Sequence, residues 1–234
     1  MSAHGGPEIV TSGLVLDLDA GNVKSYPGSG SVVTDISGTG NTGTKPGGVT
    51  VSGGAFVLDG SGAGVSAANN SSLNLTGNMA LSVWVKLGNV TNNYQSIVGK
   101  RNAASTPCNY LLRTGGALYS DPNQIQYGYY DSTWHILGTT AANLGAATWY
   151  NVTGVHNGAS DKIYLNGVDM ATTWRWGTAS GTLTTDANAF FLGSSGYTGE
   201  YMTGSVAIGS LYNRALTAAE VLQNFNANRK RFGL

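Results

Sequence analysis

The sequence carries little charge and no net charge of either sign. Charged residues make up 10% of its 234 residues, and 12 Lys and Arg balance 12 Asp and Glu. A chain without a net field has no general means of holding nucleic acid by counterion release or of docking on an anionic membrane surface. We therefore expect no nucleic-acid partner and no membrane partner.

Cysteine and long apolar runs are also scarce. Cys108 is the single cysteine, which excludes an internal disulfide and a cysteine-rich zinc site. No apolar stretch reaches the length of about 18 residues that a membrane span needs. The opening MSAHGGPEIV has neither the basic flank nor the apolar run of a secretory signal. The sequence predicts a soluble, unprocessed chain without membrane insertion.

Glycine and aromatic residues are abundant instead. The chain contains 35 glycines, 12 tyrosines, five tryptophans and five phenylalanines, and 41% of its residues are hydrophobic. This apolar content is sufficient for a folded core, and the glycine content disfavours helix-rich folds. The length suits one domain.

Alternation of apolar and polar residues predicts strands. Residues 80–87 place four aliphatic side chains on one face and Ser82 and Lys86 on the other, which indicates a half-buried strand. Because no helical pattern intervenes between such runs, the sequence predicts two packed antiparallel sheets, a sandwich or jelly roll. The comparable runs are residues 13–20, 55–60, 95–100, 124–130, 148–156, 161–167, 189–194 and 205–213.

Two local motifs predict a hairpin and a helix. Asn166-Gly167 supplies the positive φ angles of a type I′ turn between two short strands. Thr217 and Glu220 form a capping box before an apolar stripe, so the one expected helix is short and lies near the C-terminus. The stripe comprises Val221, Leu222 and Phe225. We expect the cations at 229–231 to be a solvated helix end, with a partner-binding patch as the alternative, and residues 22–54 to be a long surface connection.

Five segments occur in a characteristic order along the chain. Their order resembles that of the concanavalin A-like, laminin-G-like jelly-roll superfamily over nearly the whole chain. The resemblance implies an all-β fold, a two-sheet antiparallel jelly-roll sandwich over residues 13–234 with one short C-terminal helix, preceded by an N-terminal arm at residues 1–12. The segments are GLVLDLDAGN (13–22), FVLDGSGAGVS (56–66), SSLNLTGNMALSVWVKL (71–87), WYNVTGVHNGASDKIYLNGV (149–168) and LYNRALTAAEVLQNFNA (211–227).

The two ends of the domain carry a further resemblance. DAGN (19–22) with SYPGSG (25–30), and YNRALTAAEVLQNFNANRKRFGL (212–234), resemble versions encoded by tailed bacteriophages, in which such domains are virion surface proteins. The resemblance implies a non-enzymatic virion structural protein, on the capsid or on a fibre, assembled in the host cytoplasm against other virion proteins. The sequence leaves a homo-oligomer open. The alternative is a carbohydrate-binding adhesion module that recognises host glycans.

Catalytic residues are not evident in the sequence. A retaining glycosidase needs two carboxyl groups about 5–5.5 Å apart, and the related glucanases carry them as E-x-D-x-(x)-E on one strand. Glu8, Glu200 and Glu220 do not form this pattern. Asp17 and Asp19 share a strand face, but the resemblance assigns Asp19 to a structural turn. His4, His135 and His156 are scattered, and we expect no enzyme.

Asp59 is the weak candidate for a metal ligand. Related domains bind calcium through an Asp at this strand end and a second acid before the last strand, where this sequence has Ala207. Because a hard cation is poorly served when one carboxylate is lost, we expect no cofactor, with calcium disfavoured. Asp59 is expected to accept turn amides.

Trp174, Arg175 and Trp176 are the candidate ligand-binding residues. They are expected in a loop, where aromatic rings can form a platform for a sugar or a protein partner. The alternative is that one or both indoles cover the sandwich edge. We expect the tyrosines at 127, 129 and 130 to be strand packing, His156 to be a core or edge residue, and Cys108 to be a small buried residue or a loop thiol.

Overall fold

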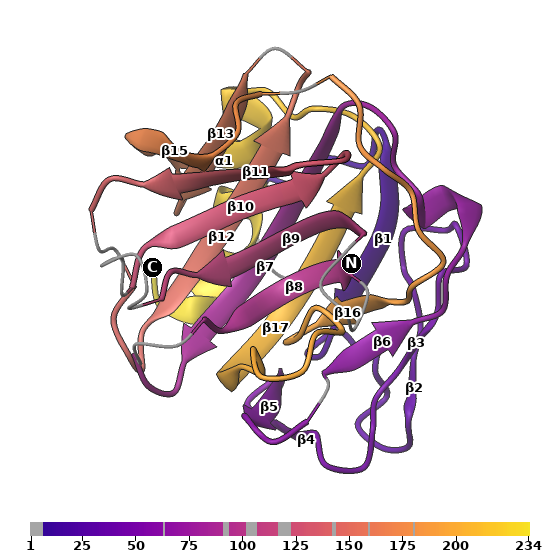
Figure 1. Cartoon of the computed structure of the whole chain (residues 1–234). Helices are drawn as coiled ribbons and strands as arrows, with labels where there is room; N and C mark the ends of the chain where they lie inside the picture. Colours follow the sequence, from indigo (N-terminus) through magenta and orange to yellow (C-terminus); the bar gives the residue numbers. More distant parts are fainter. Residues whose placement is uncertain are drawn as a thin grey trace.

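Two antiparallel sheets pack face to face in the computed structural model, which describes residues 7–62, 64–90, 94–101, 107–116, 123–141, 144–158, 160–179 and 181–234 (Figure 1). The sandwich with one short C-terminal α-helix confirms the predicted all-β jelly roll. None of the helices in these ranges is long and apolar enough to cross a membrane.

The first sheet holds eight of the described strands. Its order is β14 (Val168–Asp169), β13 (Asp161–Leu165), β12 (Trp149–His156), β7 (Met79–Leu87), β17 (Thr203–Tyr212), β5 (Ala55–Asp59) and β4 (Thr50–Ser52), and β1 (Leu14–Asp19) also pairs with β17.

The second sheet holds nine of the described strands. Its order is β15 (Thr172–Trp176), β11 (Trp134–Thr139), β10 (Ile125–Tyr130), β9 (Cys108–Thr114), β8 (Ser96–Arg101), β16 (Phe190–Leu192), β6 (Val65–Ala67), β3 (Gly43–Thr44) and β2 (Val32–Val33).

The apolar core lies between the two sheets. Leu16, Val85, Tyr127 and Tyr129 are at most 1% exposed within one continuous cluster. Because the side chains of a strand alternate between faces, the inward tyrosines of β10 leave Gln126 and Tyr130 on the outer face. The two inward tyrosines confirm the predicted strand packing.

Every strand predicted from the sequence is present, and seven of the described strands were missed. Four of these, β2, β3, β4 and β6, are only two or three residues long, and the other three, β9, β11 and β15, gave no alternating signal. In β9 the pattern is absent because all of its residues are buried, on both faces. β15 was predicted as a loop, and this prediction is wrong: four of its five residues pair with β11, with a register shift at Arg175. Cys108 lies in β9 and is fully buried, so the loop-thiol alternative is wrong, and burial raises the pKa of its thiol to about 12.

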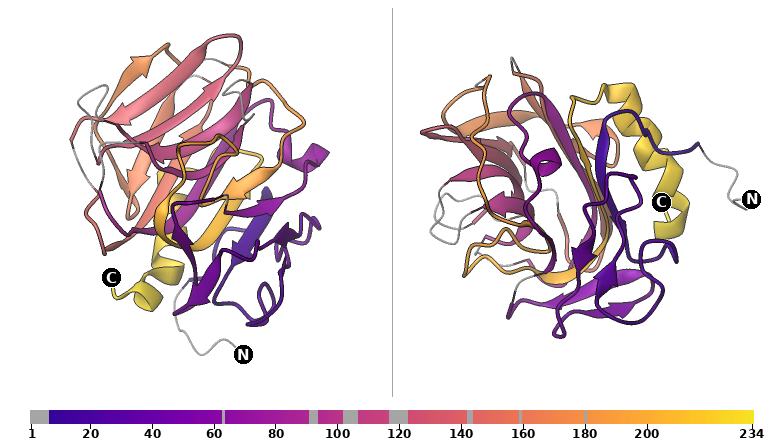
Figure 2. Two further views of the ribbon diagram at one scale, coloured as in Figure 1. Left: turned by 60° about the horizontal axis from the view of Figure 1, so that its bottom comes forward. Right: turned by 90° about the vertical axis from the view of Figure 1, so that its right-hand side faces the viewer.

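Strand β7 is buried on both faces, which corrects the prediction of a half-buried strand. Its alternate aliphatic side chains point into the core as predicted, but Ser82 and Trp84 on the other face are only 6% and 2% exposed. Helix α1 (Ala218–Asn228) and the following 3₁₀ helix (Arg229–Phe232) cover that face (Figure 2). Trp84 stacks on Phe232 and on Phe225, with ring centroids 4.1 and 5.7 Å apart.

The capping box predicts the start of α1 correctly. The Thr217 hydroxyl accepts from the Glu220 amide, and the Glu220 carboxylate accepts from the Thr217 amide at 2.8 Å. Val221 and Phe225 are buried, but Leu222 is 45% exposed, which corrects its place in the stripe. Leu222 lies at the edge of the helix beside Gly167.

The predicted type I′ hairpin at Asn166-Gly167 is confirmed, because the φ angles of these two residues are +51° and +79°.

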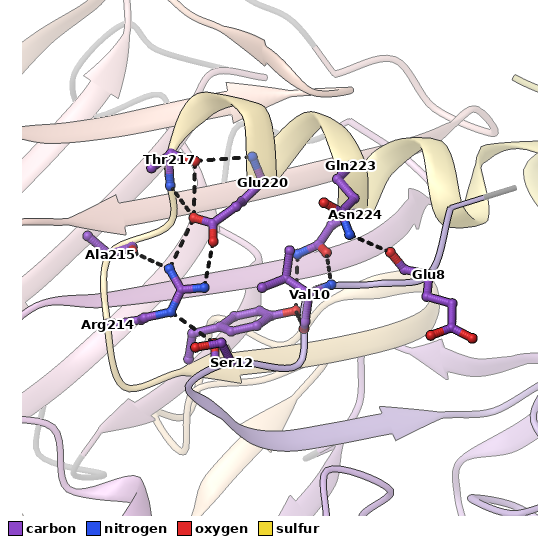
Figure 3. Close-up of polar contacts among 10 residues, drawn as sticks. Glu8, Val10, Ser12, Arg214, Ala215, Thr217, Glu220, Gln223 and Asn224 are labelled. Atoms are coloured by element: carbon purple, nitrogen blue, oxygen red, sulfur yellow. Dashed lines mark hydrogen bonds and ion pairs between the residues drawn. The ribbon is translucent and has the colours of Figure 1, made fainter.

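The described part of the N-terminal segment lies along α1 (Figure 3). The Val10 amide donates to Asn224 Oδ1 at 2.8 Å, and the Val10 carbonyl accepts from the Tyr212 hydroxyl at 3.0 Å. Arg214 donates to the Ser12 carbonyl, and Gln223 donates to the Glu8 carbonyl. Residues 8–12 therefore contact the domain's own helix, while residues 1–6 lie outside the described part of the chain.

Residues 22–54 form a surface connection that includes three short strands and a polar hub. The Asp35 carboxylate accepts from the amides of Asp17, Ser37 and Asn41, each at 2.9 Å, and these bonds hold its pKa below the usual value. At the other end of the chain Arg229 and Lys230 are exposed, as expected of a solvated helix end. Arg231 departs from that expectation, because it binds both carboxylate oxygens of Asp19 at 2.8 and 2.9 Å.

Candidate functional site

The three predicted ligand-binding residues lie on the edge strand β15 and point to different faces. Trp174 packs against the inner core, with its ring edge-on to His135 at 6.5 Å. Arg175 lies on the outer face of the nine-stranded sheet and donates to Gln124. Trp176 pairs in register with Ile136 on that outer face. The structure therefore separates Trp174 from the other two, and their binding role stays a prediction.

A polar row crosses the outer face of the nine-stranded sheet in register. Arg113 on β9 lies between Ser96 on β8 and Gln126 on β10, and the row continues through Gly138 on β11 to Thr173 on β15. Gly138 lacks a side chain, and a Cβ there would lie 2.9 Å from Arg175 Nε. The glycine therefore lets the Arg175 side chain lie close against the sheet.

Glu200, in the loop before β17, joins this row into a buried ionic cluster. Its two carboxylate oxygens lie 2.9 Å from Arg101 Nη1 and 3.0 Å from Arg113 Nη1, and Ser96 Oγ donates to it at 2.9 Å. All three charged residues are at most 7% exposed. Burial lowers the pKa of Arg113, and the Glu200 charge opposes that shift.

Aromatic rings cover both guanidinium groups. Arg101 lies 4.2 Å from the ring of Tyr197 and 5.4 Å from that of Trp134, and Arg113 lies 3.9 Å from the ring of Tyr94. The three rings are half-buried, so each keeps part of its surface in solvent. We call these three rings with Arg101, Arg113, Glu200 and Gln126 the outer-face cluster.

The outer-face cluster has the chemistry of a binding site. A buried ion network is weak support for stability, because removing charges from water costs about as much as their attraction returns. Gln126 accepts from Arg113 Nε at 3.0 Å, but its amide nitrogen is buried without a partner. An unsatisfied donor beside half-exposed rings and fixed polar groups suits a ligand with both apolar and hydrogen-bonding surface.

The cluster contains one carboxyl group, and two arginines occupy both of its oxygens. General acid and nucleophile roles in glycoside cleavage call for two carboxyl groups about 5–5.5 Å apart. The arrangement therefore suits binding better than hydrolysis.

Asp59 is exposed at the end of β5 and acts as a turn acceptor, as predicted. Its carboxylate accepts from the Ser61 amide at 2.9 Å and from the Ser61 hydroxyl at 2.7 Å, and these bonds lower its pKa. Ala207 is fully buried among Trp84 and Phe225. Within the ranges that the structure describes, no three His, Cys, Asp or Glu side chains gather to hold a metal ion.

His156 is a core residue, as one of the two predicted alternatives states. It is fully buried, and its Nδ1 lies 2.7 Å from Asp161 Oδ1. The sequence analysis missed Glu200, Arg101 and Arg113 as a group, because Glu200 and Arg113 are 87 residues apart and no local spacing joins them. The available signal was Arg113 itself, a cation next to the apolar run Tyr110–Leu112.

Comparison with solved structures places this fold among binding domains and multidomain enzymes. The binding domain of Paraclostridial Mosquitocidal Protein 1 matches with a TM-score of 0.71 and 14% identity over 92% of this chain and 52% of that one. Domain 4 of AbnA, an extracellular arabinanase from Geobacillus stearothermophilus, was solved in complex with arabinotriose. It matches with a TM-score of 0.64 and 18% identity, and the match covers 91% of this chain and 98% of that domain. Trypanosoma rangeli sialidase matches with a TM-score of 0.68 and 17% identity, and the match covers 95% of this chain and 34% of the enzyme.

This chain thus spans about half of the mosquitocidal binding domain and about a third of the sialidase. A search of curated proteins returns no match. A family model of the concanavalin A-like lectin/glucanases superfamily matches residues 59–222, which is more than half of the chain. Together with the two-sheet sandwich, this match shows that the chain belongs to the concanavalin A-like lectin/glucanase superfamily.

Proposed function

We propose that this protein is a non-catalytic carbohydrate-binding domain that holds a glycan on the outer face of its nine-stranded sheet. The observation that carries the proposal is the outer-face cluster, in which half-exposed aromatic rings are fixed over buried guanidinium groups. A sugar ring presents C–H groups that pack on aromatic faces and hydroxyl groups that exchange hydrogen bonds with amides and charged groups.

Rigidity of the cluster favours this role. Glu200 fixes both arginines, and each arginine holds the ring that covers it, so little side-chain freedom remains to be lost on binding. The same fold in domain 4 of AbnA was determined with arabinotriose, which supports carbohydrate as the ligand class.

A glycan array followed by titration calorimetry on the best ligand tests the proposal. We expect Trp134→Ala to weaken binding by about tenfold or more, since loss of a well-placed aromatic contact costs about 1–3 kcal/mol. The matched control is Trp149→Ala on the other sheet, because Trp149 is also half-buried and also lies against a cation, Lys86, at 5.2 Å. Equal affinity in wild type and Trp134→Ala, with both folded, would contradict the proposed site.

We propose in addition that the domain is displayed on the surface of a tailed-bacteriophage particle, as a capsid decoration or fibre component. The supporting observation is the resemblance of residues 19–30 and 212–234 to phage-encoded versions. The low charge also favours packing beside neighbouring virion proteins, because few ions must be desolvated. Mass spectrometry of gradient-purified particles should find many copies per particle, whereas recovery only from the soluble fraction of infected cells would contradict this role.

A further inference from the structure

A cavity of about 170 Å³ lies between the outer face of the eight-stranded sheet and the elements that cover it. Its lining includes Asp17, Ser82, Asn151 and Ser210 from the sheet and Asn224 from α1. In Figure 2 the helix α1 lies on the side of the sandwich away from the nine-stranded sheet, so the cavity beneath it and the outer-face cluster are on opposite sides of the molecule.

Three residues of a polar row on the sheet, Ser82, Ser210 and Asp17, line this cavity. Thr153, Ser82, Ser210 and Asp17 are successive cross-strand partners on β12, β7, β17 and β1. All four residues are at most 7% exposed. Because they stand in register on one face, their hydroxyl and carboxyl groups form a continuous line across four strands.

Apolar rows flank the polar row on both sides. One consists of Val155, Ala80, Tyr212 and Leu14, and it packs under Val221 of α1. The other side holds the Trp84 and Ile208 side chains under Phe225. These apolar rows already attach the helix to the sheet, so packing alone gives no reason for polar groups between them.

Several of these polar groups have unused hydrogen-bonding capacity. Asp17 accepts from Ser210 Oγ at 2.8 Å, and burial raises the pKa of its carboxyl to about 7. Asn151 Oδ1 is buried without a partner. Ser82 Oγ accepts from both Asn151 Nδ2 and Thr153 Oγ1, so its own hydrogen is available for another acceptor. The cavity thus offers acceptors at Asp17 and Asn151 with a donor at Ser82 between them.

Size and charge narrow the ligand class. An engineered cavity of about 150 Å³ holds benzene, so the present volume accommodates one six-membered ring. Asp17 and Ser82 are two strand spacings apart, roughly 10 Å between backbones, which suits a ring with substituents at both ends. Asp17, Asp19 and Asp35 repel anions, and Arg231 is engaged with Asp19.

We propose that this cavity is a second ligand site, which takes a single neutral, monosaccharide-sized polyol through Asp17, Ser82 and Asn151. A polyol both donates and accepts, so its hydroxyl groups match acceptors and a donor in one row. The site is separate from the outer-face cluster, and neither proposal depends on the other.

Saturation-transfer NMR and calorimetry with three hexoses, D-glucose, D-galactose and D-mannose, test the proposal on the full chain. We expect at least one hexose to bind and to shift the ¹³C resonance of the Asp17 carboxyl. Ser82→Val, which fills the cavity and removes the donor, should weaken that binding by about tenfold or more. Asp17→Leu, which has a similar volume and removes both acceptor oxygens, provides a second variant should Ser82→Val fail to fold, and it should weaken hexose binding as well.

Leu222→Ala, on the exposed side of α1, is the control variant and should leave hexose binding unchanged. Trp134→Ala serves to show whether the sugar binds at the outer-face cluster instead. Three results would overturn the proposal: no hexose bound at millimolar concentration, which assigns the cavity to water; binding that survives both cavity variants; or binding lost in Trp134→Ala alone, which places the sugar at the outer-face cluster.

Discussion

The outer faces of the two sheets are covered in different ways. On the eight-stranded sheet, α1, the 3₁₀ helix and residues 8–12 cover the face, so Trp84 and Ile208 are buried as in a second core. On the nine-stranded sheet, no helix of the described chain lies over the outer face (Figures 1 and 2), and an ionic cluster under aromatic rings takes that place. The outer face of the eight-stranded sheet is thus covered by other segments of the chain. The outer face of the nine-stranded sheet is covered by its own side chains, which remain partly accessible to a ligand.

The largest expected effect comes from breaking the outer-face cluster. Glu200→Ala leaves the guanidinium groups of Arg101 and Arg113 buried without their common counter-charge. Loss of one partner from a buried ion pair costs about 3–5 kcal/mol of unfolding free energy. Urea denaturation measures it, with Glu220→Ala on the half-exposed pair to Arg214 as the control expected to cost about 1 kcal/mol. Equal losses would mean that the cluster contributes no more than a surface pair.

The polar row beneath α1 gives the next effect, and this one depends on pH. The pKa of Asp17 is about 7 in the folded protein against 3.8 for the unperturbed group, so folding favours the protonated acid. The contribution of Asp17 to the free energy of unfolding is therefore largest below about pH 4, and it is lost as the pH rises towards 7. At about 1.4 kcal/mol per pKa unit, the fall is on the order of 3–4 kcal/mol.

Asp17→Asn should remove that decline, because the amide keeps an acceptor for Ser210 and does not ionise. The variant is therefore expected to unfold at higher urea concentration than wild type at pH 8, with the difference shrinking at pH 5. Parallel pH profiles for the two proteins would show that Asp17 is solvated or paired in solution.

The covering helix is tested by Phe225→Ala. Phe225 is 8% exposed and stacks on Trp84, so truncation should cost about 3 kcal/mol. Leu222→Ala in the same helix is the matched control, and because Leu222 is 45% exposed its cost should stay below about 0.5 kcal/mol. Similar costs for the two variants would mean that α1 does not bury its Phe225 side against the sheet.

The smallest expected effect is that of a chelator. Asp59 is satisfied by Ser61 and Ala207 stands where a second acid would be needed, so EDTA should leave the melting temperature unchanged. A fall of about 5 °C, roughly 2 kcal/mol for a domain of this size, would reveal a stabilising cation.

Local patterns in the sequence were enough to predict most of the fold. The hairpin at Asn166-Gly167 and the capping box at Thr217 depend on chemistry within four residues, and both are present. Strand β9 could not be found in this way, because a strand buried on both faces loses its alternation. The side on which Leu222 lies could not be predicted either, since it depends on how the helix is rotated against the sheet.

The candidate site was less accessible to sequence reasoning. The trio at 174–176 was grouped by adjacency, but Trp174 is directed inward, and the register shift between β15 and β11 leaves Arg175 and Trp176 together on the outer face. Glu200 and Asp17 acquire their roles from residues on other strands, Arg113 for the first and Ser210 for the second. Only the register of the sheets brings these groups together.

The bonds between residues 8–12 and the C-terminal helix also determine how the domain is presented. Because the Val10 and Ser12 contacts hold the first described residues against Asn224 and Arg214, both ends of the described chain leave from the side of the eight-stranded sheet (Figures 2 and 3). A carrier joined at either end would sit on that side. The nine-stranded sheet would then face outward from the carrier, whichever end made the attachment.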